Sequence, residues 1–437
     1  MASAALPDPD GQSRLGIPTL GGVTTAPLPS GLRVRTRRVD DPGGLLELLP
    51  DERPLCWVRG GEGLVGWGEV ARFTASGPGR FAEADAWWRS FAAGLDMRDE
   101  VGREGTGPVA FLSFTFADAS PGSVVVVPRV VVGRAGGVAW ITEFAPGDGP
   151  AVRPVRPVRP SGPLRYADGW LPVAGYREAV GRAARRMRAG ALEKAALAHD
   201  LLAVAEAPLD PRFLLAGLAR RYPSCWSFAV DGLVGATPEL LVRRSGSTVA
   251  SQVLAGTAWS EEESPVDATV LARRLLSSEK DLREHALAVE SLAAALRPLS
   301  VELDVPEAPG VIALHNVSHL ATDVHGKLDR DDPATLLRLA AAVHPTAAVG
   351  GTPRAAALAL ITELEGMDRG RYAGPVGWVD ADGDGELGIA LRCAQLHGPV
   401  ARLFAGCGVV ADSNPDTEVR EAAAKFRPVR EALEGLP

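Results

Sequence analysis

The stretch LFAGCGVVADSNPDTEVREAAAKF (403–426) places a strand, a bend and a helix in direct succession. The glycines of the bend would let a ligand lie close to the backbone, although such glycines are more often simple bends. In the following helix Glu418, Glu421 and Lys425 share one face, because residues three and four apart are neighbours on a helix. That face is either solvated, as is usual for such charges, or it holds a ligand.

A second acidic helix is predicted over SSEKDLREHALAVESL (277–292). Asp281 and Glu284 are three residues apart, and they border the apolar stripe of this helix rather than lying opposite it. Two helices that each offer a carboxylate pair could supply oxygen ligands to Mg²⁺. Two unrelated surface helices are the alternative.

Two further features suit the binding of a small anionic molecule. The segment HPTAAVGGTPR (344–354) is a loop broken by Pro and Gly that opens a helix, where backbone N–H groups can face an anion. Arg392 is predicted to lie within the apolar strand GIALRCAQL, where an unpaired charge would be costly. It therefore needs a carboxylate from the protein or from a ligand.

Strands and helices occur in blocks, which predicts an α+β fold with antiparallel sheets. Turn residues separate short apolar runs from Leu32 to Thr142, and the later part alternates helical and strand-like stretches. The expected strands include PLCWVRG, VAFLSF, SVVVVPRVVVG, VAWIT, the run from Lys194 to Ala203, the hairpin CWSFAVDGLVGATPELLVRR, GELGIALRCAQL and ARLFAGCGVV.

Composition divides the chain into four parts. Residues 1–30 are expected to form a disordered tail, and residues 31–150 the β-rich N-terminal part. Residues 151–165 repeat Val-Arg-Pro, which disfavours helix and predicts an exposed connection between two halves of one fold. Residues 166–437 contain both acidic helices and Arg392, and are expected to carry the functional site.

The net charge and the pattern of apolar residues favour a small molecule as the partner of this protein. The net charge is −8 and no Lys/Arg stripe is present, which argues against nucleic acid. No run approaches the ~20 apolar residues of a membrane helix. Four cysteines without a CxxC pair fit a reducing cytoplasm and suggest neither disulfides nor zinc.

Seven segments in order resemble the chorismate-utilising enzymes, most closely the isochorismate synthases. The resemblance covers nearly all of the chain from Tyr176 onward, and it implies large antiparallel sheets packed as a sandwich with helices outside. The segments are LEKAALAHD, GATPELLV, LAGT, SSEKDLREH, HPTAAVGGTPR, RYAGPVGWVDADGDGELGIALRC and the opening stretch.

The resemblance implies a Mg²⁺ cofactor and chorismate as substrate. Glu284 and Glu421 would be direct metal ligands, with Asp281 and Glu418 holding metal-bound waters. The face of the C-terminal helix would then hold a metal.

The resemblance also implies an acid and a base. Lys194 would take a proton from water attacking ring carbon 2, and Glu239 would protonate the hydroxyl leaving carbon 4. Free Lys and Glu have pKa values of about 10.4 and about 4.3, and burial favours the neutral form of each. Taken alone, Lys194 could be a surface residue at a strand end and Glu239 a hairpin residue.

The remaining implied positions surround the substrate. Lys425, the backbone at Gly406, Arg392 and Tyr372 would contact carboxylates, Thr257 the departing hydroxyl, and His319, Ala348 and Val349 the ring. One departure from the family is His199, which stands where an arginine is common.

Alternatives within the family differ in nucleophile and product. The chain shows no glutamine-amidotransferase segment, and Lys194 favours water over ammonia. Ala255 stands where aminodeoxychorismate-forming relatives have lysine. Val349 should hinder the folded-over pose that a salicylate synthase needs, although Tyr372 is shared with that branch. A menaquinone pathway is favoured over a siderophore pathway, and a catalytically inactive chorismate-binding protein is the alternative from another class.

Overall fold

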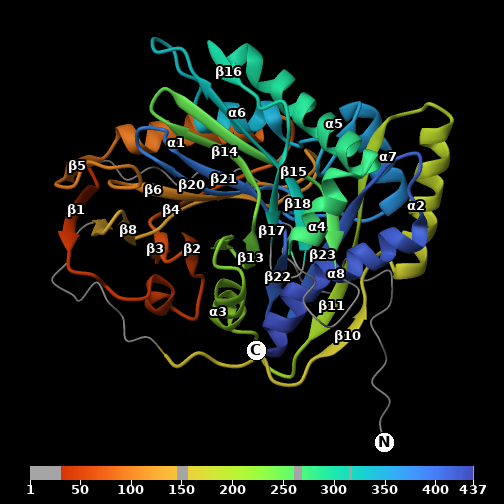
Figure 1. The fold of residues 1–437 in the computed structure, drawn as a ribbon. Coiled ribbons are helices and arrows are strands. Elements are labelled where there is room, and N and C mark those ends of the chain that lie inside the picture. The colour runs from red at the N-terminus through yellow and green to blue at the C-terminus, as the bar shows by residue number, and fades with distance from the viewer. Residues whose placement is uncertain (1–30, 145–155, 260–267, 314–316, 437) are drawn as a thin grey trace, which may run out of the picture.

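The protein forms two large β-sheets with helices around them (Figure 1). The computed structural model describes residues 31–144, 156–259, 268–313 and 317–436. Among these residues one sheet has 13 strands and the other has 10. Every described pairing is antiparallel except that of β1 with β5, which is parallel.

The strands of the larger sheet follow one another as hydrogen-bonded neighbours, with β19 (Gly351–Thr352) beside β11. They run β10 (Arg165–Asp168), β11 (Lys194–Val204), β23 (Val400–Val409), β22 (Cys393–His397), β13 (Leu233–Thr237), β12 (Trp226–Val230), β2 (Leu55–Arg59), β3 (Glu62–Trp67), β8 (Val130–Ala135), β9 (Val138–Phe144), β1 (Arg33–Val39) and β5 (Asp96–Asp99).

The smaller sheet is arranged in the same way, with β17 (Gly310–Ala313) beside β18. Its strands run β16 (Glu302–Asp304), β18 (Val317–Lys327), β15 (Thr248–Trp259), β14 (Leu240–Ser245), β21 (Gly385–Ile389), β20 (Pro375–Asp380), β6 (Val109–Ser113), β7 (Ser123–Val127) and β4 (Ala71–Ala75). Strands β6 and β7 are buried along their whole length, so both faces of this sheet are covered there.

Helices cover the outer faces (Figure 1), as the predicted α+β class requires. Helices α2 and α7 pack on β11, α8 on β23, and α5 on β15 and β18. No helix among the described residues is long and apolar enough to cross a membrane. The helices are α1 (Arg80–Ala93), α2 (Val173–Arg188), α3 (Pro211–Arg221), α4 (Ala268–Leu276), α5 (Glu279–Leu296), α6 (Leu336–Val343), α7 (Arg354–Glu365) and α8 (Pro415–Glu434), with short 3₁₀ turns at η2 (Leu45–Leu48) and η3 (Arg297–Leu299).

Both sheets combine strands from the two parts of the chain that the Val-Arg-Pro segment joins. In the larger sheet β12 pairs with β2, and in the smaller sheet β20 pairs with β6. Residues 156–163 of the connection lie outside helices and strands and are largely exposed. The predicted tail 1–30 and residues 151–155 lie outside the described residues.

Three predicted strands are in fact interrupted where the chain crosses between the sheets. The run GELGIALRCAQL was predicted as one strand, but β21 belongs to the smaller sheet and β22 to the larger. The crossing ends at Arg392, whose φ of 45° is left-handed and ends strand geometry. Pro128 similarly separates β7 from β8, and Pro238 separates β13 from β14, because proline donates no ladder hydrogen bond. The expected hairpin is confirmed for β12 and β13.

A buried ion pair fastens the connection to α3, and its loss should destabilise the fold. Asp210 caps α3, accepts from the Arg159 N–H at 3.1 Å, and pairs with Arg212 at 2.7 Å, with the two side chains 0% and 3% exposed. Because Asp210→Ala leaves the buried charge of Arg212 without its paired carboxylate, we expect a loss of about 3–5 kcal/mol in urea unfolding. The matched control Glu363→Ala, whose ion pair with Arg186 is exposed, should change little. Equal effects of the two substitutions would contradict this.

Candidate active site

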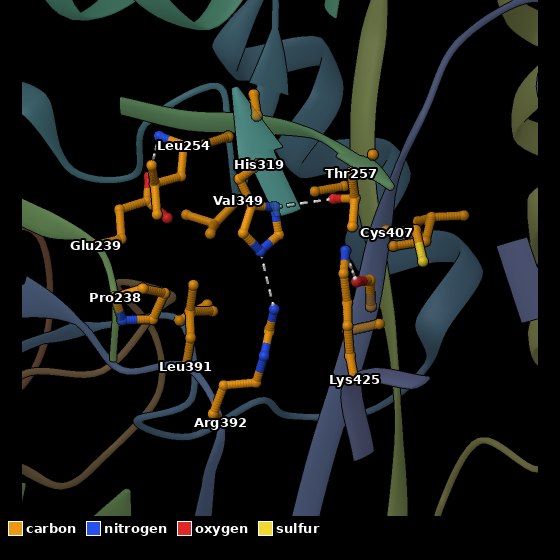
Figure 2. Close-up of a pocket in the computed structure, with 18 of the residues that line it drawn as sticks. Pro238, Glu239, Leu254, Thr257, His319, Val349, Leu391, Arg392, Cys407 and Lys425 are labelled. Atoms are coloured by element: carbon orange, nitrogen blue, oxygen red, sulfur yellow. Dashed lines mark hydrogen bonds between the residues drawn. The ribbon is translucent and has the colours of Figure 1, made fainter. Parts of the chain in front are cut away.

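A pocket opens between the two sheets and gathers most of the predicted site residues (Figure 2). Its walls come from β11 and β23 of the larger sheet, from β15 and β18 of the smaller sheet, and from the loop before α7. Glu239 and Glu284 line it. So do all eight residues predicted to contact substrate, which are Thr257, His319, Ala348, Val349, Tyr372, Arg392, Gly406 and Lys425.

Lys194 is fully buried beside this pocket. Its side chain is 0% exposed, and its Nζ lies 3.0 Å from Oε1 of Glu284. The two atoms are close enough for an ion pair, but their angles do not meet those of a hydrogen bond. Among the described residues, Lys194 Nζ has no hydrogen-bond acceptor. The interpretation of Lys194 as a surface residue is therefore wrong.

Two glycines of β23 serve this arrangement in different ways. A Cβ at Gly408 would lie 2.1 Å from Oε1 of Glu284, so a side chain there would occupy the place of the carboxylate. A Cβ at Gly406 would instead lie 2.3 Å from the carbonyl oxygen of Leu197 on β11. The missing side chain of Gly406 thus makes room for a neighbouring strand rather than for a ligand, while its carbonyl accepts from Lys425 Nζ at 3.0 Å.

Glu239 is a buried carboxyl group that keeps its proton. It lies where the chain crosses from β13 to β14, and it is 3% exposed. Burial raises its pKa to about 8, an effect that outweighs a weak hydrogen bond from the Leu254 N–H and the cations of Lys194 and Arg392. The pocket therefore contains a neutral carboxylic acid at pH 7.

Arg392, His319 and Thr257 form a chain of hydrogen-bond contacts across the pocket (Figure 2). Nη2 of Arg392 lies 3.3 Å from Nε2 of His319, and Nδ1 of His319 lies 3.1 Å from Oγ1 of Thr257. In the part of the chain that is described, no carboxylate pairs with Arg392. Its remaining N–H groups are available to a ligand carboxylate.

The two acidic helices meet beside β23. Glu421 pairs with Lys425 at 2.6 Å, which confirms that they share one face of α8. The Oε1 atom of Glu418 accepts from Lys280 at 3.0 Å, and burial, followed by the charge of Glu421, raises the pKa of Glu418 to about 7.

This cluster fits a divalent cation. Possible ligand atoms of Cys407, Glu418 and Glu421 lie within 4.8 Å of one another. Asp281 interacts electrostatically with Glu421, and Glu284 interacts with Lys425, the partner of Glu421. The repulsion that raises the pKa of Glu418 is what a bound cation would relieve, and the carboxylate oxygens are the donors that Mg²⁺ prefers. The Cys407 thiol is not such a donor, and it donates instead to the Glu418 carbonyl at 3.3 Å.

Comparison with known proteins identifies the family of this chain. The family described as chorismate binding enzyme matches residues 167–434. The chain belongs to this family. A Mycobacterium tuberculosis protein, a candidate isochorismate synthase MenF, is 38% identical over 349 residues, which cover 76% of this chain and 88% of that protein. The isochorismate synthase DhbC of Bacillus subtilis is 41% identical over 269 residues, or 59% of this chain and 67% of that protein.

Solved structures agree with the family. A Bacillus anthracis protein, described as a candidate 2,3-dihydroxybenzoate-specific isochorismate synthase DhbC, has a TM-score of 0.75 at 33% identity and covers 90% of this chain and 99% of its own. The menaquinone-specific isochorismate synthase MenF of Escherichia coli has a TM-score of 0.75 at 24% identity, covering 94% and 96%, and supports the fold alone. The predicted family and fold class are confirmed, and the protein is an enzyme.

A buried ion pair that the sequence interpretation missed holds one wall of this pocket. Arg369 pairs with Glu365, with side chains 3% and 1% exposed, and donates to the carbonyls of Val349 at 3.0 Å and Ala196 at 2.6 Å. Glu365 in turn accepts from the N–H of Ala198 at 2.8 Å. The pair thereby fixes the loop before α7 against β11. Its (i, i+4) spacing was the available signal.

Tyr372 and His199, two other residues singled out in the sequence, are both packed against aromatic rings. Tyr372 stacks on Phe404 at 4.9 Å, and burial raises its pKa to about 12, so it stays neutral. His199 faces the helices, stacking on Tyr176 at 4.5 Å and meeting the edge of Phe426 at 5.0 Å. The departure from the family at this residue therefore concerns helix packing rather than the pocket wall.

Glu239 should make stability depend on pH. The folded protein keeps its proton up to about pH 8, whereas the ordinary pKa is 4.5. The unfolded state binds fewer protons between these values, so stability falls as pH rises through that window. We expect Glu239→Gln to exceed the native protein in stability by on the order of a few kcal/mol at about pH 9 and to match it near pH 4, measured by urea unfolding. The exposed control Glu290→Gln should show no such trend. A difference that stays constant with pH would refute the assignment.

Proposed function

We propose that the protein is an isomerase that converts chorismate to isochorismate, with Mg²⁺ as cofactor. The observation that carries the proposal is the neutral Glu239 carboxyl in a pocket that Glu284, the partner of the buried Lys194, and Lys425, the partner of Glu421, also line. The reaction needs a proton donor for a departing hydroxyl, a group that takes a proton from water, and charge to hold a dianion. Each is supported by a described residue.

The acid and the base act on opposite ends of one displacement. Lys194 lies beside Glu284 as the ammonium, so it must first release a proton. As the amine, it then takes a proton from the water whose oxygen bonds to ring carbon 2. The ring double bonds shift, the bond from carbon 4 to its hydroxyl oxygen breaks, and Glu239 gives its proton to that oxygen, which leaves as water. One water enters and one leaves, so the step is an isomerisation.

Chorismate carries two carboxylates, and the pocket offers two places for them. Arg392 has free N–H donors and no carboxylate partner among the described residues. Asp281, Glu284, Glu418 and Glu421 would hold Mg²⁺, which when bound supplies positive charge for the other carboxylate. Lys425 lines the pocket beside this cluster.

Water is the proposed nucleophile and isochorismate the proposed end product. Elimination to salicylate requires the enolpyruvyl group to fold over the ring. The branched Val349 lines the pocket, and its backbone is held by Arg369, which supports a wall that resists this pose. Tyr372 is the feature shared with salicylate synthases, but its ring is already packed on Phe404.

We place this activity in menaquinone biosynthesis and in the cytoplasm. The relative named MenF aligns over 349 residues and DhbC over 269, so the former includes more of the N-terminal part. The four free, buried cysteines are compatible with a reducing compartment.

Deleting the gene should deplete menaquinone. Intact menaquinone with loss of a catecholate siderophore would contradict the pathway.

Removing a metal ligand should abolish both turnover and cation binding. We expect Glu284→Gln and Glu421→Gln each to lose about 10²-fold or more in turnover, because each removes a charged oxygen from a site that needs several. Mg²⁺ should also no longer raise their melting temperature. Glu290→Gln, on the exposed face of α5, is the matched control. Normal turnover and normal Mg²⁺ stabilisation of both variants would refute the metal assignment.

Chromatography of a long incubation with chorismate and Mg²⁺ tests the reaction itself. We expect isochorismate to approach equilibrium with chorismate, and Lys194→Ala to lose about 10²–10⁴-fold in rate while still binding chorismate. Salicylate and pyruvate appearing in step with chorismate loss would favour a salicylate synthase. Stabilisation by chorismate without any product would favour an inactive binding protein.

A further inference from the structure

The donor and the acceptor in each contact among Arg392, His319 and Thr257 follow from the fixed protonation of the guanidinium. Nη2 of Arg392 lies 3.3 Å from Nε2 of His319, and a guanidinium can only donate. Nε2 must therefore accept, and it carries no hydrogen. A neutral imidazole has one N–H, which leaves that hydrogen on Nδ1.

The imidazole is held in its neutral form. Burial, and after it the neighbouring charges of Arg392 and Lys425, lower the pKa of His319 well below its usual value. A protonated ring would also place an N–H against the guanidinium. A smaller effect of the Gly256 backbone in the opposite direction does not offset them.

The Nδ1–H group then determines what the Thr257 hydroxyl can do. Nδ1 lies 3.1 Å from Oγ1 of Thr257, so the oxygen accepts from the ring. A hydroxyl that accepts here keeps its own hydrogen for another partner. Among the described residues the Thr257 hydroxyl has no other partner, and Thr257 lines the pocket.

The backbone is shaped to make this contact. The register of β15 and β18 shifts between Ala255 and Thr257, and Gly256 has a φ of 76°. A bulge of this kind re-aims the following side chain. Here it sets Thr257 directly opposite His319 in the ladder.

We propose that Arg392 fixes His319 as the Nδ1–H tautomer, and that His319 thereby makes the Thr257 hydroxyl a hydrogen-bond donor to the ligand. His319 is a positioning residue in this scheme. The ligand atom it serves rests on the proposed isochorismate-forming reaction: it is the oxygen that leaves carbon 4 and gains negative charge as its bond breaks. A donor placed in advance at that oxygen stabilises the transition state more than the bound substrate.

The tautomer is measured without any substrate. Protein labelled with ¹⁵N-histidine is recorded by long-range ¹H–¹⁵N correlation at neutral pH, and the signals missing from His319→Asn assign the ring. We expect a protonated-type shift at Nδ1 and an unprotonated-type shift at Nε2. The opposite pattern overturns the proposal whether or not the protein turns over chorismate.

Kinetics test the role of the hydroxyl. Thr257→Val, which removes the donor at constant shape, should lower kcat roughly 10²-fold with little change in KM, and Thr257→Ser should keep most of the rate. His319→Asn retains an N–H near the Nδ1 position and should be mild, whereas His319→Leu should match Thr257→Val. The double variant Thr257→Val/His319→Leu should lose no more than either single variant, because both remove one device.

The spectrum, the kinetics and the melting temperatures together distinguish a wrong tautomer scheme from a wrong proposed function. Equal turnover of Thr257→Val and the native protein, or losses that multiply in the double variant, overturns the scheme. Melting temperatures, with and without chorismate, show whether each variant is folded and binds. A native protein without turnover defeats the proposed function, and the spectrum alone then decides the tautomer.

Discussion

Burial of the Lys194 ammonium against the Glu284 carboxylate is the interaction on which the pocket depends. Lys194 begins β11, which pairs with β23 and β19 and is covered by α2 and α7. A cation in such a place is costly unless an anion accompanies it. Helix α5 supplies that anion, and β23 must leave room for it at Gly408. One ion pair thus fixes three elements that are distant in sequence.

The same interior holds two glutamates in opposite states. Burial alone would raise the pKa of Glu284, but the charge of Lys194 and of lysines further off lowers it below the ordinary value. Glu239 experiences similar burial without a lysine in contact, and its pKa rises to about 8. Distance to Lys194 therefore separates a carboxylate suited to bind a cation from an acid suited to give up a proton.

The sequence predicts those parts that depend on local spacing. The acidic faces of α5 and α8, the strand from Lys194 and the β12–β13 hairpin all follow from neighbouring residues. The burial of Lys194 does not, because its partner Glu284 is distant in sequence and lysines usually lie on surfaces. The Glu365–Arg369 pair was missed although its members are only four residues apart, because the carbonyls of Val349 and Ala196 that accept from the buried Arg369 are distant in sequence. The break at Arg392 was missed because the apolar residues around it continue a strand pattern.

The crossing between the sheets shows why local pattern fails at the site itself. Ala373 and Arg392, with φ of 60° and 45°, both line the pocket in a left-handed conformation that costs on the order of 1–3 kcal/mol for such residues. Each is held by a hydrogen bond to another segment, Ala373 N–H to the Ala390 carbonyl and the Arg392 carbonyl to the Ala236 N–H. The two sheets determine where the chain must cross, and the crossing presents the Arg392 guanidinium to His319 rather than burying it within a strand. The strain is therefore located where a charged side chain must face a ligand, and it is offset by the sheets on either side.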